Sequence, residues 1–329
     1  MRRNSLLKLF AAAMAWLSSG LALAQKTVDA YPAKPVTIII PFVPGASADH
    51  ESRLYSQKLT ESMGHAFVHD YKPGAGAIIA MTHVGKAAPD GYTLIFTSQS
   101  YSIIPAFYTT NPPYDAVRDF TPVSLMSKRP TMLLVHPSLP ANSLQEYIAY
   151  ARTHPGEINF ATTGAGGAYH IAGAWLHSLT NTRVTFVHYK GGAPVYIDLL
   201  AGRVNATPGT FLMGLQYVKA GKLRALANLG LERSPSLPDL RTAAEQGLPE
   251  YEYPSWSGYL APARTPAAIV NKLSAEFAKA SKAPDVIQKL ESQGAVPVGS
   301  TAEQFMQTIV TEVTRWRKVV QENNLKIEG

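Results

Sequence analysis

The chain has 329 residues, a formal net charge of +7 and no cysteine. The lack of cysteine excludes disulfides and thiolate metal sites. The basic residues form no run and do not alternate with aromatic residues, which argues against nucleic acid as a partner, whereas a mildly positive field favours anionic ligands.

Residues 1–24 have the pattern of a secretory signal peptide, too short to span a membrane. Arg2, Arg3 and Lys8 form a basic start, an apolar stretch follows, and Ala22-Leu23-Ala24 is a small-residue cleavage site. The general secretory route is favoured, and the paired arginines leave the twin-arginine route open. Losing these three positive groups lowers the charge from +7 to +4. We expect a periplasmic mature protein of about 305 residues, enough for roughly two lobes.

The sequence is organised around residues 41–49, PFVPGASAD. The apolar run before them, residues 36–40, predicts a strand that is buried on both faces of a sheet. Prolines end this strand, small residues then allow another molecule close to the backbone, and a helical pattern with Leu54 and Leu59 follows. A helix N-terminus carries unpaired N–H groups and a partial positive charge, so this unit predicts an anion-binding turn.

Strand and helix patterns alternate along the rest of the chain, which predicts an α/β fold with mainly parallel sheets and helices on both faces. We expect further strands at residues 66–68, 92–97, 120–127, 131–135, 158–161, 184–189, 204–207 and 223–227. We expect helices that end at Ala87 and Ala220, and others at residues 143–151, 171–179, 194–200 and within 269–320. Polar or small residues predict loops at 98–100 and 208–210. We place one lobe at residues 25–132 plus 256–329 and the other at 133–255.

A second unit of strand, small-residue turn and helix occurs at residues 159–179, with the turn sequence TGAGGA at 163–168. Two such turns, far apart in the sequence, would suit a cleft in which each presents a helix N-terminus to an anion. The alternative interpretation is that each is an ordinary turn between strand and helix, since a single glycine-rich turn is weak evidence for a ligand.

Catalytic motifs are missing from the sequence. We find no G-x-x-x-x-G-K-[ST], no H-E-x-x-H and no G-x-S-x-G. His170 and His177 share a helix face without an acidic partner, and His65 and His69 lack a third ligand, so packing is favoured over metal binding. Asp49 is expected to stabilise its helix start and not to act as a base. These observations predict binding without reaction and without a metal or cofactor.

An ordered series of short motifs carries a family resemblance along nearly the whole mature chain. The motifs are Tyr31-Pro32, residues 41–45 (PFVPG), 73–76 (PGAG), 88–94 (APDGYTL), 164–166 (GAG) with His170, 189–191 (YKG), 220–227 (AGKLRALA), 233–235 (RSP) and 260–262 (LAP). On these motifs the chain resembles the Bug-type periplasmic solute receptors of tripartite tricarboxylate transporters. The resemblance implies a two-lobed Venus flytrap fold and a monomer that closes on a small carboxylate. It also implies delivery to the large and small membrane permease subunits.

In such receptors loop N–H groups, hydroxyls and ordered water hold the ligand carboxylates. Carried to this sequence, the resemblance implies ligand contacts at Val43, Gly45, Ala46, Ser47, Ala48, Ser98, Thr163, Ala165, Gly166, Gly167, Thr207 and Thr210. Relatives usually have a second glycine where Ala46 stands, and often acids where Asn205 and Gly209 stand. These departures remove repulsion and make the lining more apolar, which suits a dicarboxylate and permits an aromatic one such as terephthalate.

Two other classes of function use part of the same pattern. A hydrolase or isomerase would need a base and a nucleophile in the cleft, and the sequence offers neither pair. A receptor that presents its ligand to a membrane sensor kinase would use the same binding chemistry as a transport receptor. The sequence therefore leaves transport and sensing open.

Overall fold

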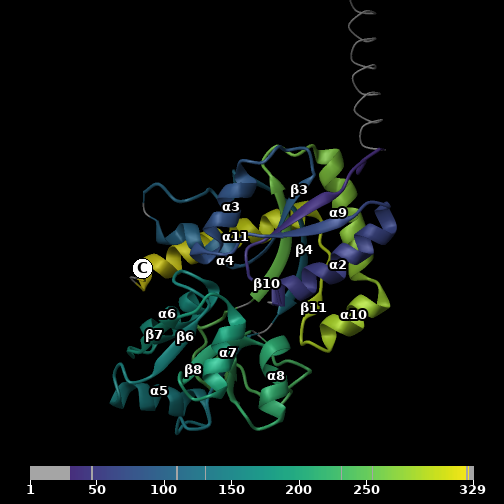
Figure 1. The fold of residues 1–329 in the computed structure, drawn as a ribbon. Helices are drawn as coiled ribbons and strands as arrows, with labels where there is room; N and C mark the ends of the chain where they lie inside the picture. Colours follow the sequence, from purple (N-terminus) through teal and green to yellow (C-terminus); the bar gives the residue numbers. More distant parts are fainter. Residues whose placement is uncertain are drawn as a thin grey trace, which may run out of the picture.

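The computed structural model describes residues 30–45, 47–108, 110–129, 131–230, 232–253, 255–323 and 325. The predicted signal peptide at residues 1–24 and the predicted contact Ala46 lie outside these residues. The chain forms two lobes, each built on its own sheet with helices packed around it (Figure 1). No helix in the described ranges combines the length and the apolar character that crossing a membrane requires.

Lobe 1 contains a six-stranded sheet with the order β11-β4-β10-β3-β1-β2. Its strands are β1 (Val36–Ile40), β2 (Phe67–Tyr71), β3 (Thr93–Ser98), β4 (Phe120–Arg129), β10 (Ser255–Pro262) and β11 (Val296–Pro297). Its helices are α2 (Ser47–Met63), η1 (Ala75–Ala77), α3 (Ile78–Gly85), α4 (Ser100–Ile103), η2 (Ile104–Phe107), α9 (Ala267–Ser281), α10 (Pro284–Glu291) and α11 (Ala302–Glu322). The segment predicted as a loop at 98–100 therefore ends one strand and begins a short helix.

Lobe 2 contains a five-stranded sheet with the order β7-β6-β8-β5-β9. Its strands are β5 (Thr131–Val135), β6 (Asn159–Thr162), β7 (Thr185–His188), β8 (Ala206–Thr210) and β9 (Arg224–Asn228). Its helices are α5 (Leu144–Thr153), α6 (Ala168–Leu179), α7 (Gly192–Leu200), α8 (Phe211–Lys219) and η3 (Ala244–Gln246). The chain passes from lobe 1 to lobe 2 after Arg129 and returns before Ser255.

The predicted two-lobed α/β fold is confirmed, but the sheets are mixed where mainly parallel sheets were expected. Strand β1 runs parallel to β2 and β3, whereas β10 runs antiparallel to β3 and β4. Likewise β6 is parallel to β7 and β8, whereas β5 is antiparallel to β8 and β9. The strands that run against their sheets are β10 and β11 in lobe 1 and β5 in lobe 2, and of these β5 and β10 stand at the chain crossings.

The prediction of a loop at residues 208–210 was wrong. These residues pair with β5 in strand β8, with Pro208 opposite Leu133 and Thr210 opposite Thr131. A proline is tolerated here because the other neighbour, β6, pairs with β8 only through Phe160 and Ala206, so that side of Pro208 needs no ladder hydrogen bond.

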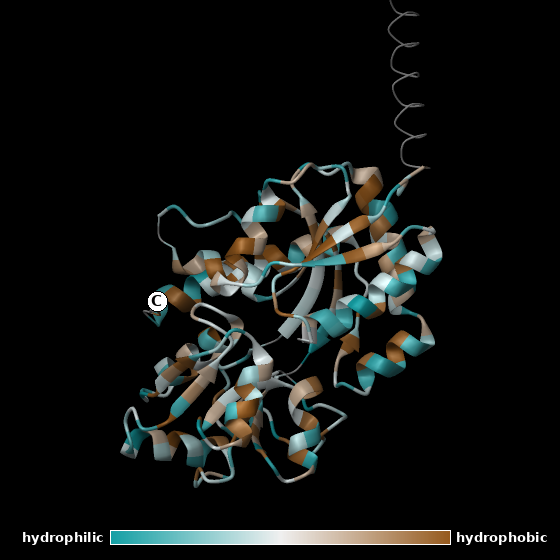
Figure 2. Cartoon of the chain, in the orientation of Figure 1, coloured by the Kyte–Doolittle hydropathy of each residue, from teal (hydrophilic) through white to brown (hydrophobic). Residues whose placement is uncertain are grey.

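Alternation of side chains buries both faces of each sheet. In β1, Val36, Ile38 and Ile40 pack on one face, in the cluster that includes helices α2 and α9, whereas Ile39 packs on the other face. This confirms the prediction of a strand buried on both sides. Figure 2 shows the result as brown hydrophobic segments inside the lobes, while α2 is largely teal along its outer side.

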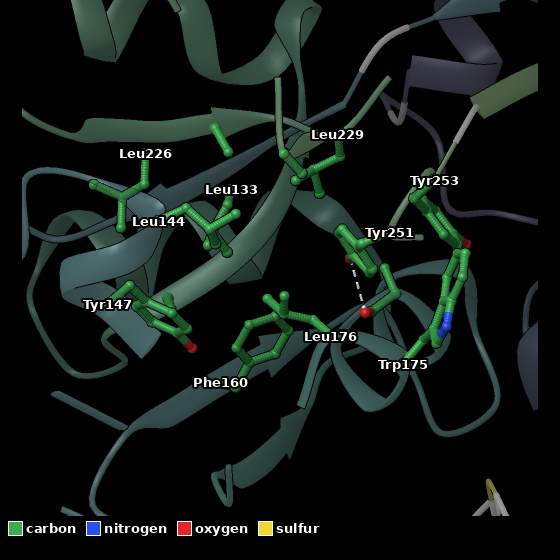
Figure 3. Packing of buried hydrophobic residues seen from close by; sticks show 14 of the residues in the cluster. Leu133, Leu144, Tyr147, Phe160, Trp175, Leu176, Leu226, Leu229, Tyr251 and Tyr253 are labelled. Carbon is green, nitrogen blue, oxygen red and sulfur yellow. Dashed lines mark hydrogen bonds between the residues drawn. The ribbon is translucent and has the colours of Figure 1, made fainter. Parts of the chain in front are cut away.

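The core of lobe 2 follows the same rule. Leu133 and Val135 face one cluster, and Met132 and Leu134 face the other. Figure 3 shows the first cluster, in which the Tyr251 hydroxyl also donates a hydrogen bond of 2.9 Å to the carbonyl of Ala172.

Helix α11 belongs to the cores of both lobes. Phe305 and Ile309 pack in a cluster of lobe 1, whereas Trp316 is fully buried in the cluster of lobe 2. The Trp316 ring lies 5.2 Å from that of Trp175 and 5.8 Å from that of Tyr253, both edge to face. Figure 1 shows this helix crossing lobe 1 and ending beside lobe 2. The two lobes are therefore held by a helix as well as by the chain crossings.

Candidate functional site

Glycines lie at several close approaches of the two lobes, and two of them are at the cleft. A Cβ atom built on Gly76, at φ +63°, would lie 3.5 Å from the carbonyl oxygen of Ala165 in the other lobe. A Cβ atom on Gly191, at φ +115°, would lie 3.2 Å from Cγ2 of Val43. Glycine therefore serves here both for the left-handed backbone and for the close approach of the two lobes.

Between the lobes lies a cleft with two chambers. The outer chamber, of about 560 Å³, is lined by Pro41, Phe42, Val43, residues 73–77, Ser100, Thr163, Gly164, Ala165, Gly167, Ala168, Tyr189, Lys190 and Gly191. The inner chamber, of about 110 Å³, is lined by Phe42, Ala48, residues 96–99, Arg129, Thr131, Thr163, Ala168, Tyr169, Gly191, Gly192, Thr210, Met213, Tyr253 and residues 255–257. Four residues line both chambers, so we describe them as one cleft.

The structure brings most of the predicted contacts to this cleft. Val43, Thr163, Ala165 and Gly167 line the outer chamber, and Ala48, Ser98, Thr163 and Thr210 line the inner chamber. Ser47 is the first residue of α2. Gly45, Gly166 and Thr207 line neither chamber. Contact of any of these residues with a ligand stays a prediction.

Thr207 and Gly45, which line neither chamber, form hydrogen bonds that hold the neighbouring strand and turn in place. The buried Thr207 hydroxyl donates to the carbonyl of Ala161, at 2.9 Å, and so ties β8 to β6. The Gly45 N–H donates to Asp49 Oδ2, at 2.9 Å. Asp49 therefore stabilises the turn before α2, as expected from its place in the first turn of the helix.

Asp49, itself buried, is the centre of a polar group that holds this turn. Its Oδ1 accepts from the Tyr71 hydroxyl, at 2.7 Å, and lies 2.9 Å from Nε of Arg53 and 3.3 Å from Nδ1 of His69. Burial acts to raise the pKa of Asp49, but the hydrogen bonds from Gly45 and Tyr71 and the charge of Arg53 outweigh it and lower the pKa. Asp49 is thus ionised at neutral pH, and the turn keeps its acceptor.

A Ser-His-Asp arrangement occurs here that the sequence analysis missed. Nε2 of His69 lies 3.1 Å from Oγ of Ser52 and 2.9 Å from Oγ of Ser56, while Nδ1 faces Asp49. Both serines are buried, and neither lines the cleft. The Ser56 hydroxyl also donates to the carbonyl of Ser52, at 2.7 Å. The arrangement therefore fastens α2 to β2 beneath the turn.

The turn of lobe 2 is supported by one histidine. Nδ1 of His170 accepts a hydrogen bond of 3.0 Å from the N–H of Gly166. Burial, helped by the nearby His188, lowers the pKa of His170 to about 4. The ring is therefore neutral at pH 7 and keeps Nδ1 as an acceptor. His177 is buried between Tyr147 and Thr182, in agreement with the predicted packing role.

The inner chamber contains a charged residue that the sequence analysis did not identify. Arg129, the last residue of β4, is buried and forms an ion pair with Glu51 of α2, which is also buried. The Ser257 hydroxyl lies 2.9 Å from both carboxylate oxygens of Glu51. Burial lowers the pKa of Arg129 to about 10, so its guanidinium is protonated at neutral pH.

Acidic and metal-binding groups are scarce at this site. The residues that line the two chambers include Arg129 and Lys190 but no aspartate or glutamate. Within the described ranges, no group of three or more histidine, aspartate and glutamate side chains is placed to hold a metal ion. The cleft therefore presents turn N–H groups, hydroxyls and two cations.

Comparison with known proteins places this architecture in a family. Residues 52–325 match the profile of the tripartite tricarboxylate transporter family receptor. Protein BugT of Bordetella pertussis is 34% identical over 317 residues, which cover 94% of this chain and 95% of BugT.

Two solved structures are similar over nearly the same length. Rpa4515 of R. palustris with adipate has a TM-score of 0.84 at 33% identity and covers 90% of this chain and 99% of its own. MatC (Rpa3494) from Rhodopseudomonas palustris with bound malate has a TM-score of 0.83 at 31% identity, over 88% of this chain and 100% of its own. The chain thus belongs to the tripartite tricarboxylate transporter receptor family and is a Bug-type solute-binding receptor.

Proposed function

We propose that this receptor binds a small dicarboxylate in the periplasm and delivers it to the permease subunits of a tripartite tricarboxylate transporter. One observation carries the proposal. Two small-residue turns that begin helices α2 and α6 meet at one cleft, whose charged lining residues are Arg129 and Lys190. N–H groups at helix starts and cations both favour a carboxylate.

The expected energies are sufficient for such a ligand. A hydrogen bond to a charged group contributes roughly 1.5–3 kcal/mol, and a helix terminus up to about 2 kcal/mol when partly buried. A few such contacts reach the roughly −8 kcal/mol of a micromolar complex once association costs are subtracted. The neighbours with adipate and malate support the same class of ligand.

The lining also favours a ligand with an apolar middle. Phe42 lines both chambers, and Phe96, Met213 and Trp256 line the inner one. Such side chains bury apolar carbon favourably, so both an aliphatic diacid and an aromatic one such as terephthalate fit the proposal. None of the lining groups is arranged as a base beside a nucleophile, and we propose binding without turnover.

Calorimetric titration tests the proposal. We expect micromolar dissociation constants for a diacid among adipate, malate and terephthalate, and clearly weaker binding of hexanoate and benzoate. NMR of the mixture should show the ligand unchanged. Failure of every carboxylate to bind, or conversion of the ligand at catalytic rates, would contradict the proposal.

Delivery to a permease needs a separate test in cells. Deletion of the gene should abolish uptake of the labelled diacid, and the wild-type gene should restore it. Normal uptake together with a lost transcriptional response to the diacid would instead assign the receptor to a sensor kinase.

A further inference from the structure

Three polar side chains of the inner chamber have buried polar atoms without a hydrogen-bond partner. They are Thr97 through Oγ1, Arg129 through Nε and Trp256 through Nε1, none of which bonds to another described residue. These residues are 1%, 7% and 4% exposed, respectively. They come from β3, β4 and β10, which lie next to one another in the sheet of lobe 1.

The chemistry of the three groups is the same. A guanidinium and an indole N–H only donate hydrogen bonds, and a threonine hydroxyl is able to donate. A buried donor without an acceptor is unfavourable, and one such group in a folded protein needs an explanation. Three of them lining one chamber are explained together by a group that is rich in acceptors and poor in donors.

Charge identifies that group more closely. Arg129 is the one charged residue among those that line the inner chamber. Its partner Glu51 does not line the chamber, and the Ser257 hydroxyl lies 2.9 Å from both oxygens of that carboxylate. An arginine fork has five donors, so the pair with Glu51 leaves others for a second carboxylate.

We propose that the inner chamber binds the second carboxylate of the ligand, with Arg129, Thr97 and Trp256 as its hydrogen-bond donors. The turns that line the outer chamber then hold the first carboxylate, and the apolar side chains of Phe42, Phe96 and Met213 contact the carbon chain or ring between the two carboxylates. This inference rests on the proposed function and narrows the substrate class to dicarboxylates with an apolar middle.

Two substitutions test this assignment without touching the ion pair. Thr97→Val is nearly isosteric and removes a polar atom that has no partner within the described structure, so the ligand-free protein should melt at the same temperature or slightly higher. Trp256→Phe removes the indole N–H but also leaves a cavity beside Phe305, so its ligand-free form should melt somewhat lower. Affinity for adipate, pimelate or terephthalate should fall about tenfold to a hundredfold. Affinity for hexanoate, heptanoate or benzoate should not change, because these lack the second carboxylate.

The chain offers matched control positions. Trp175 Nε1 and Ser102 Oγ are also buried without a described partner, but neither residue lines a chamber. Trp175→Phe and Ser102→Ala should therefore leave diacid affinity unchanged. The double variant Glu51→Gln with Arg129→Gln removes both charges of the pair and should weaken diacids while sparing monoacids.

The outcomes separate the two proposals. If wild-type protein binds the diacids but Thr97→Val and Trp256→Phe bind them equally well, the assignment of the inner chamber is wrong and the proposed function stands. Equal losses for diacids and monoacids would also overturn the assignment. If wild-type protein binds none of the three diacids in calorimetry, the proposed function fails with it.

Discussion

The two chambers of the cleft are built by different means. The outer chamber is made of backbone and small residues in turns, such as residues 73–77 and 163–167. The inner chamber is made of buried side chains from separate strands, with the Arg129–Glu51 pair at its wall. A substitution in the outer chamber should therefore change binding with little effect on folding, whereas removal of one charge of the buried Arg129–Glu51 pair should affect both.

Glu51→Gln should have the largest effect on stability. It leaves the guanidinium of Arg129 buried without a compensating charge, which costs about 3–5 kcal/mol of unfolding free energy. Chemical denaturation of the ligand-free protein measures this loss. Glu61→Gln on the same helix is the control, because Glu61 is 55% exposed in its pair with Lys58 and should cost less than about 1 kcal/mol. Similar losses in both variants would remove the distinction between the chambers.

Ala165→Asp should have the largest effect on binding without a loss of stability. Its carboxylate would face that of the ligand, and two such charges about 4 Å apart repel by roughly 4 kcal/mol at an effective dielectric of about 20. Affinity should fall close to a thousandfold, while an acid near the start of α6 leaves folding intact. Ala165→Asn has the same shape without the charge and should bind far better. Undiminished affinity in a normally folded Ala165→Asp protein would place the ligand elsewhere.

His170 supports the turn at residues 163–168, and its contribution to stability should decrease at acidic pH. Its pKa is about 4 in the folded protein, against an ordinary value of 6.5, so the unfolded chain binds the proton more readily. The contribution of neutral His170 to the free energy of unfolding is complete above pH 6.5. It is lost as the pH falls toward about 4, by up to about 1.4 kcal/mol per pH unit.

Comparison with His170→Asn measures this contribution. Asparagine can still accept from the Gly166 N–H but does not titrate. Between pH 7 and pH 5 the wild-type protein should lose about 2 kcal/mol more unfolding free energy than His170→Asn. Ligand affinity should change little over that interval, because the folded protein keeps the ring neutral. If the unfolding free energies of both proteins fall equally between pH 7 and pH 5, His170 is not responsible for the pH dependence.

The outer chamber could be predicted because its signals are local. A run of branched residues, two prolines and a series of small residues specify strand β1 and the turn after it within a short stretch of sequence. The same holds for β6 and the turn at residues 163–168. Helix α5 begins at Leu144, one residue after the predicted start, and Ser143 caps it, with its hydroxyl accepting from the N–H of Glu146 at 3.1 Å; a helix cap is also a local feature.

The inner chamber could not be predicted because its residues come from segments that are far apart in the sequence. Glu51 stands among polar residues of α2 and resembles an exposed helix face, and Arg129 follows a strand that was expected to end at residue 127. Only the folded chain brings the two charges together. Similarly, Pro208 and Gly209 indicate a loop by composition, but the short pairing between β6 and β8 leaves Pro208 room in a strand, and the side chains of Tyr196 and Leu134 leave room for no Cβ atom at Gly209.

Helix α11 gives the molecule a mechanical property that two chain crossings alone would not provide. Two single-chain connections alone would be flexible and would allow the lobes to bend and twist in several directions. Helix α11 is packed into one lobe at Phe305 and into the other at Trp316, and it therefore limits the directions in which the lobes can move. We therefore expect the cleft to open mainly by rotation of one lobe relative to the other about the axis of this helix.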